Sequence, residues 1–177
     1  MSDEVDYDAP DHCTVGVIGE VGSRLFLFYV RQGITETTVK VEKQQVSVLA
    51  SYLGRIVKEL GRPGHLPEDL TFYGGEDPEW VVGTIGVSYD EEIDRIVIVF
   101  EEAGGEVDDE EEDLGVDDDE SRHVLRIALS REQAAAFAIH ATRLVEAGRP
   151  PCPLCGLPLD PSGHDCPRTN GHRPPVT

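Results

Sequence analysis

The sequence lacks any apolar run long enough to cross a membrane. Its longest apolar runs, Leu25–Val30 and Ile96–Phe100, have the length of a β-strand, whereas a bilayer requires about 20 apolar residues. The first eight residues contain neither the basic segment nor the apolar segment of a secretory signal. We therefore expect a cytoplasmic protein that does not associate with membranes.

Catalytic motifs are missing as well. The sequence contains no Ser-His-acid order, no HExxH and no P-loop. Four histidines outside the C-terminal tail share no motif, and they are His12, His65, His123 and His140. His140 lies off the apolar stripe of a predicted helix, so we expect it to be exposed. The sequence leaves enzymatic activity uncertain and favours a non-catalytic role.

Basic residues are scarce, and the acidic residues are unevenly distributed. The 15 Lys and Arg residues face 35 Asp and Glu residues, which gives a net charge of -20. Thirteen of the acidic residues lie in Glu101–Glu120, and without them the charge is -20 + 13 = -7. Blocks of like charge are usually solvated, so residues 103–121 are predicted to be a disordered insertion. The acidic balance makes nucleic-acid binding unlikely.

Two stretches of the sequence resemble two later stretches. Thr14–Gly19 (TVGVIG) matches Val81–Gly86 (VVGTIG) at an offset of 67, and Val41–Val46 (VEKQQV) matches Leu129–Ala134 (LSREQA) at an offset of 88. The offsets differ by 21 residues, which is nearly the length of the acidic insertion. We interpret the chain as two copies of one unit, at residues 12–61 and 79–148, with the insertion in the second copy.

Each copy is predicted to contain three strands and a helix. Runs rich in β-branched and aromatic residues predict strands, and apolar residues at helical spacing predict helices. The predicted strands are 13–18, 24–31 and 37–41, then 80–89, 93–102 and 123–129, and the predicted helices are 43–60 and 131–147. The connector Gly61–Pro78 is rich in glycine and proline and should be irregular.

These elements predict an α+β fold. The copies could form one continuous sheet or pack as a pseudo-symmetric pair, and we favour a single domain over residues 12–149, with an antiparallel sheet and two helices. Residues 1–11 should be a flexible N-terminus.

The cysteines carry the strongest chemical signal. Cys13 stands alone in an apolar strand and should be a buried thiol. The other three lie in the tail 150–177, where the CxxC turn of Cys152 and Cys155 is followed by His164 and Cys166. Such spacing completes a tetrahedral structural Zn²⁺ site, and a reducing location favours metal over a disulfide. His172 is the alternative fourth ligand.

The tail sequence PCPLCGLPLDPSGHDCPRTNG, the stretch Glu42–Val46 and the acidic insertion together resemble a bacterial family catalogued as domain of unknown function 3090. The resemblance covers nearly the whole chain. It implies a small zinc knuckle or ribbon at the C-terminus, with His164 as the usual ligand, because an aromatic Tyr commonly stands where this chain has His172. Members are often encoded beside a kinase-like protein and a histidine-phosphatase-like protein, which implies a pathway partner and no particular activity.

Three functions remain open at this point. The first is a non-catalytic zinc-binding adaptor or regulatory protein that binds a protein partner. The second is an enzyme or ligand-binding protein that uses the cleft between the two copies. The third is nucleic-acid binding by the zinc tail, which only Arg149, Arg168 and Arg173 support. The sequence does not indicate an oligomeric state.

Overall fold

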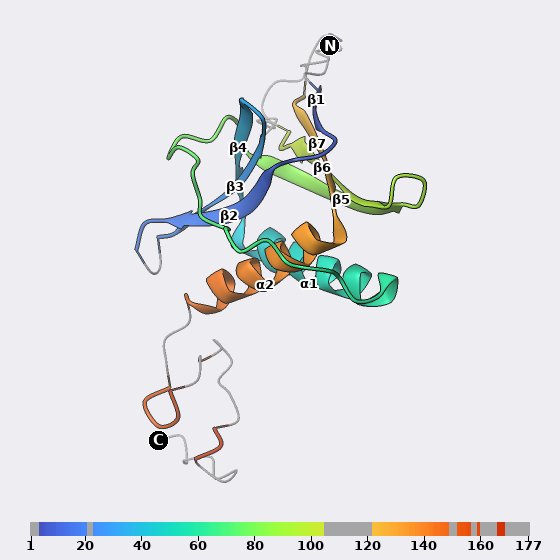
Figure 1. The fold of residues 1–177 in the computed structure, drawn as a ribbon. Coiled ribbons are helices and arrows are strands. Elements are labelled where there is room, and N and C mark those ends of the chain that lie inside the picture. Colours follow the sequence, from blue (N-terminus) through green and yellow to red (C-terminus); the bar gives the residue numbers. More distant parts are fainter. Residues whose placement is uncertain are drawn as a thin grey trace, which may run out of the picture.

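The computed structural model describes residues 4–20, 23–104, 122–148, 152–156, 159 and 166–168. Within these residues the chain forms seven strands and two helices (Figure 1). In chain order they are β1 (Glu4–Tyr7), β2 (His12–Ile18), β3 (Leu25–Gln32), β4 (Thr35–Val41), α1 (Lys43–Leu60), β5 (Val82–Asp90), β6 (Arg95–Glu102), β7 (Val124–Leu129) and α2 (Arg131–Glu146). The mixed α+β class predicted from the sequence is confirmed.

The strands form two sheets. One sheet has the order β2-β3-β4 and is antiparallel throughout, while the other has the order β1-β7-β6-β5. In the second sheet β5, β6 and β7 are antiparallel and β1 pairs parallel with β7. Figure 1 shows α1 and α2 side by side on one side of the two sheets.

Two expectations from the sequence are corrected here. The residues predicted to be a flexible N-terminus, 1–11, contain the strand β1, which the parallel partner β7 holds in place. The sequence could not reveal this strand, because its four residues include two carboxylates and its order depends on a partner 120 residues away. The single antiparallel sheet is also wrong, because the strands divide into two sheets.

Both helices begin with a capping box. In α2 the Ser130 side chain accepts from the backbone N–H of Gln133, whose own side chain accepts from the backbone N–H of Ser130 at 3.0 Å. In α1 the Gln45 side chain likewise accepts from the backbone N–H of Glu42 at 2.8 Å. Such reciprocal pairs satisfy backbone N–H groups that have no partner within the helix.

No helix in the described part of the chain has the length and apolar character needed to cross a membrane.

One hydrophobic core joins both sheets and both helices. Its centre contains three aromatic rings from three elements: Phe28 of β3 lies 4.6 Å from Phe100 of β6 and 5.6 Å from Phe137 of α2, measured between ring centroids. All three side chains are at most 1% exposed. Aromatic side chains bury large apolar areas and pack in tilted arrangements such as these. The two sheets therefore share one interior.

The connector between α1 and β5 is irregular, as its glycine and proline content predicts. It covers the outer face of the β2-β3-β4 sheet, where Thr14 Oγ1 donates to the carbonyl of Leu70 at 2.8 Å. The ring of Phe72 lies so close to Gly16 that a Cβ at Gly16 would stand 2.4 Å from a ring carbon. Gly16 is therefore required for close packing, since any side chain would displace Phe72.

The pairing registers allow two halves of the chain to be compared, β2-β3-β4 followed by α1 and β5-β6-β7 followed by α2. Val15 pairs with Phe28, which pairs with Val39, and in the other half Val87 pairs with Ile98, which pairs with Ile127. Val39 and Ile127 are 88 residues apart, which is the offset between the helices. Val15 and Val87 are 72 apart, so the match of Thr14–Gly19 with Val81–Gly86 at an offset of 67 is five residues out of register. The glycines of that match serve local packing instead, because a Cβ at Gly83 would meet Ala103 at 2.7 Å.

Candidate metal centre

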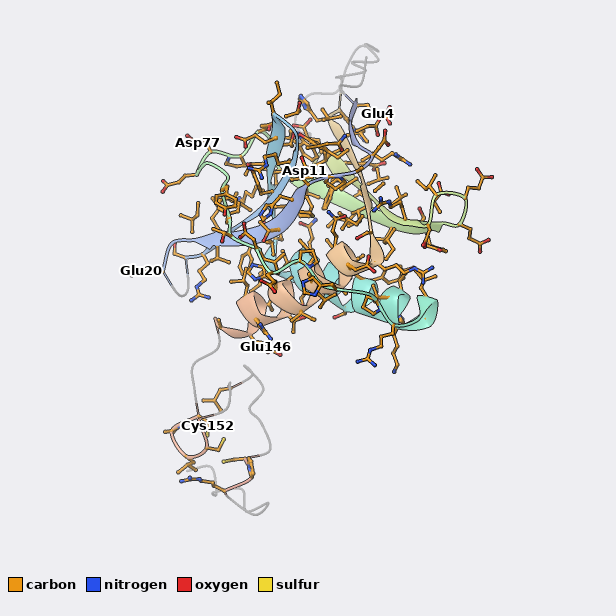
Figure 2. The ribbon with its side chains drawn as sticks, viewed as in Figure 1. Glu4, Asp11, Glu20, Asp77, Glu146 and Cys152 are labelled. Carbon is orange, nitrogen blue, oxygen red and sulfur yellow. The ribbon has the colours of Figure 1, made fainter. Side chains whose placement is uncertain are left out.

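The C-terminal CxxC sequence forms a tight turn. The backbone N–H of Gly156 donates to the carbonyl of Cys152 at 2.8 Å, which closes the turn. Gly156 itself has a φ of 74°, in the left-handed region that glycine adopts without steric cost. Figure 2 shows Cys152 beyond Glu146 and outside the helices and sheets. The sequence Cys-Pro-Leu-Cys-Gly thus supplies both the ligand atoms and the turn that brings them to one side.

Three cysteine sulfur atoms come together around this turn. The Sγ atoms of Cys152, Cys155 and Cys166 all lie within 4.8 Å of one another, and those of Cys152 and Cys166 are 3.9 Å apart. Tetrahedral Zn²⁺ with Zn–S bonds of about 2.3 Å separates its sulfur ligands by about 3.8 Å. The three cysteines can therefore bind one metal ion.

Backbone N–H groups also favour the thiolate form of the first cysteine. Hydrogen bonds from the backbone N–H groups of Cys155 and Leu154, with smaller contributions from the side chains of Cys155 and Cys166, hold the pKa of Cys152 below its usual range. Since metals bind the thiolate, a lowered pKa reduces the free energy needed to deprotonate the ligand. None of the described cysteines forms a disulfide, and 3.9 Å is far longer than the S–S bond of about 2 Å.

The structure brings three of the sequence-predicted ligands together. Cys152 is 6% exposed, and Cys155 and Cys166 are half-buried. His164 and the alternative ligand His172 lie outside the described residues. The acidic insertion also lies outside them, except for Ala103 and Gly104 after the end of β6.

Cys13 is not part of this cluster. It lies in β2 and is 5% exposed, and burial raises the pKa of its thiol above the usual range. The expectation of a buried core thiol is confirmed.

The histidines outside the tail make contacts that sequence analysis did not predict. His140 is half-buried rather than exposed, because its Nε2 lies 3.0 Å from the carbonyl of Val15 on the edge strand β2. His12 Nε2 lies 2.8 Å from the carbonyl of Thr71 in the connector. His123 Nδ1 lies 2.8 Å from Glu102 at the base of the β6–β7 connection, and this contact lowers the pKa of Glu102. No sequence signal marks these roles, because the partners are distant in the chain.

The fold and the cysteine cluster define an α+β protein with a candidate metal site near its C-terminus. Comparison with family models identifies the family: residues 5–166 match the model described as protein of unknown function, DUF3090, and the chain belongs to this family. No curated protein and no solved structure matches the chain.

Proposed function

We propose that this is a non-catalytic Zn²⁺-binding protein that acts as an adaptor or regulatory partner in the bacterial cytoplasm. The observation that carries the proposal is the convergence of three Sγ atoms within 4.8 Å on a tight turn. His164 is the fourth ligand, and the resulting site is a closed structural knuckle. Four protein ligands leave no coordination position for a substrate, so the Zn²⁺ orders the tail and does not catalyse a reaction.

Zinc content tests the metal site. Purified full-length protein should contain one equivalent of Zn²⁺, and Cys152→Ser should lose it, because a serine hydroxyl is a poor replacement for a thiolate ligand. Cys13→Ala is the matched control, since it removes a cysteine that lies outside the cluster. Elemental analysis of the folded proteins measures both. A metal-free wild-type protein, or equal loss of zinc in the control, would refute the site.

A second pair of variants identifies the fourth ligand. His164→Ala should weaken Zn²⁺ binding, whereas His172→Ala should not, and competition with a chromogenic chelator measures the difference. Each ligand contributes substantially to an apparent binding free energy of about 10 kcal/mol or more. The opposite result would assign the ligand to His172.

The adaptor role requires a protein partner, and a kinase-like or a histidine-phosphatase-like protein is the first candidate. An enzyme would need a cleft between the two halves, but Phe28, Phe100 and Phe137 pack together there. This packing supports a binding role over a catalytic one. A purified candidate partner should bind the wild-type chain in a calorimetric titration. Binding to none of the candidates, together with turnover of a small substrate by the isolated protein, would favour an enzyme instead.

The two β-β-β-α units are, we propose, copies of one ancestral unit. Gln45 and Gln133 occupy corresponding positions at the beginnings of the two helices, 88 residues apart. The Gln45 amide donates to the carbonyl of Val82 at 3.2 Å, and that of Gln133 donates to the carbonyl of Pro10 at 2.6 Å. Val82 and Pro10 are 72 residues apart, the offset of the first strands. Each helix start therefore bonds to the backbone at, or two residues before, the beginning of the first strand of the other half.

A further inference from the structure

The two halves differ at one pair of corresponding positions. The helix of the second half, α2, lies against the edge strand of the first half, β2, and His140 Nε2 is 3.0 Å from the carbonyl of Val15. The corresponding residue of α1, 88 positions earlier, is Tyr52, and the carbonyl corresponding to that of Val15 belongs to Val87. Tyr52 instead lies beside Arg55, whose guanidinium carbon is 5.0 Å from the ring centroid. One edge strand is therefore covered by a helix, and its counterpart is not.

An open groove lies where the second contact is missing. It runs between α1 and β5, has a volume of about 750 Å³, and is lined by residues of both halves, among them Val48, Tyr52, Ile85 and Val87. Val48 is 61% exposed and Tyr52 is 39% exposed. A groove of this volume with apolar walls is typical of sites that bind a ligand or a peptide.

The strand beside the groove has a free edge. β5 is the last strand of its sheet: a single parallel bridge joins Lys40 of β4 to Val81 just before β5 begins, and from Val82 onward the outer edge pairs with no strand in the described residues. The Gln45 amide donates hydrogen bonds to the carbonyls of Val82 and Gly83 at the beginning of this edge. The remainder of the edge, Thr84–Tyr89, contains no Lys and no Pro that would prevent another strand from pairing with it. An extended chain laid in the groove could hydrogen-bond to this edge and place every second side chain against the apolar wall.

Charge indicates which occupant fits. Glu42 is the charged residue among those that line the groove, and the strand ends in Asp90 and is followed directly by Glu91 and Glu92. Arg55 is the cation beside Tyr52. The chain as a whole carries a net charge of -20, so a second copy would be repelled, and a segment with Lys or Arg would be attracted.

We propose that the groove between α1 and β5 binds an extended segment of a partner protein, in which apolar residues alternate and Lys or Arg residues flank them. The segment adds a strand to the free edge of β5. This inference rests on the proposed adaptor role and specifies the surface that performs it. It assigns partner binding to the body of the protein and leaves the zinc tail a separate role.

The test begins with a library of random twelve-residue peptides displayed on phage and selected against the immobilised full-length protein. Selected peptides should show alternating apolar residues with flanking Lys or Arg. Synthetic peptides with the selected sequences should bind the Val48→Lys variant at least about tenfold more weakly than the wild type, as measured by fluorescence anisotropy. The reason is that the variant places a positive charge in the apolar wall, where it repels the Lys or Arg residues of the peptide. Binding to Ile34→Lys should not change, since Ile34 is fully exposed in the β3–β4 turn and away from the groove.

Several outcomes would overturn the proposal: no enriched sequence, enrichment of acidic peptides, or equal binding to both variants. The competing occupant of the groove is a second copy of this chain, and analytical ultracentrifugation of the protein without peptide measures whether it dimerises. A dimer that Val48→Lys abolishes and Ile34→Lys preserves would assign the groove to a second copy.

The same variants separate this inference from the adaptor role. If a physiological partner binds the wild type and Val48→Lys equally, the groove is wrong and the adaptor role stands. If no partner binds the wild type, the adaptor role itself fails.

Discussion

The α2–β2 contact and the α1–β5 groove are the two places where the helix of one half faces the first strand of the other, yet one is closed and the other is open. The closed side has small residues on the helix, with Ala136 at 2% exposed, and a histidine that reaches a strand carbonyl. The open side has Val48 and Tyr52 at the corresponding positions. A helix lined with alanine can approach a strand closely, whereas larger side chains hold the helix away from it. A few side-chain sizes thus decide whether an edge strand is covered.

Exchanging the small and large residues is expected to have the largest effect. Ala136→Val should destabilise the protein by about 2 kcal/mol, because an added side chain in a tightly packed contact forces the helix outward. Chemical denaturation measures the free energy of unfolding. The difference in helix propensity, about 0.6 kcal/mol, acts in the same direction, so the excess over it reports packing.

Val48→Ala is the reciprocal change on the open side. Its effect should stay within about 0.5 kcal/mol, as for exposed positions in general. If Val48→Ala costs as much as Ala136→Val, the two contacts are equally closed and the comparison fails.

The histidine contact should have the next largest effect. His140→Phe keeps a ring at the position but leaves the Val15 carbonyl without its side-chain partner, which should cost about 1–2 kcal/mol. Tyr52→Phe removes the hydroxyl at the corresponding position and should change stability by less than about 0.5 kcal/mol. Thermal unfolding measures the stability of both variants. If His140→Phe is as stable as the wild type, the contact between His140 and the Val15 carbonyl does not contribute to stability.

The features that the halves share should respond equally to substitution. Gln45→Ala and Gln133→Ala each remove one hydrogen bond at a helix start, together with the bonds of the Gln45 amide to the carbonyls of Val82 and Gly83 or that of the Gln133 amide to the carbonyl of Pro10. Each should cost about 1 kcal/mol. Urea denaturation of the two variants would contradict the pseudo-symmetry if only one of them were destabilised.

The smallest effect should come from an exposed ion pair that one half has and the other lacks. Hydrogen bonds from Tyr89 and Arg131 hold the pKa of Asp94 below its ordinary value of 3.8. At the corresponding positions, Arg24 replaces Asp94 and Lys43 replaces Arg131, so no such pair can form. The contribution of Asp94 to stability is present above pH 3.8 and is lost as the pH falls through its lower folded-state pKa.

Asp94→Asn tests this pair, because Asn also tolerates the φ of 50° at this position. The melting temperature of the variant should be slightly lower at pH 7, and the gap should close under acidic conditions. A gap that is constant with pH would show that the carboxylate charge has no role.

Much of the secondary structure could be predicted from local patterns. The helix α1 has the predicted bounds, α2 differs by one residue at its end, and the predicted strands of both halves are present. These elements follow from periodic apolar residues and capping pairs that lie close together in the sequence. β1 could not be predicted, because its pairing with β7 is long-range and only two of its four residues, Val5 and Tyr7, are apolar.

For the candidate sites, too, the sequence predicted the part that depends on a local motif, and the structure supplied the rest. The CxxC spacing indicated a metal site, and the structure adds that the Sγ atom of Cys166 reaches the same point. The groove had no sequence signal, because Val48 and Ile85 come from different halves and neither belongs to a motif. The match at an offset of 67 was misleading, since glycines recur for local steric reasons at Gly16 and Gly83.

The sequence by itself determined the helices, most of the strands and the cysteines that can bind a metal, because these depend on residues a few positions apart. Only the tertiary structure decided the division into two sheets, the strand register of the halves and the difference between a closed and an open edge. Those features depend on how side chains from distant segments fit together, and a single local pattern is compatible with either arrangement.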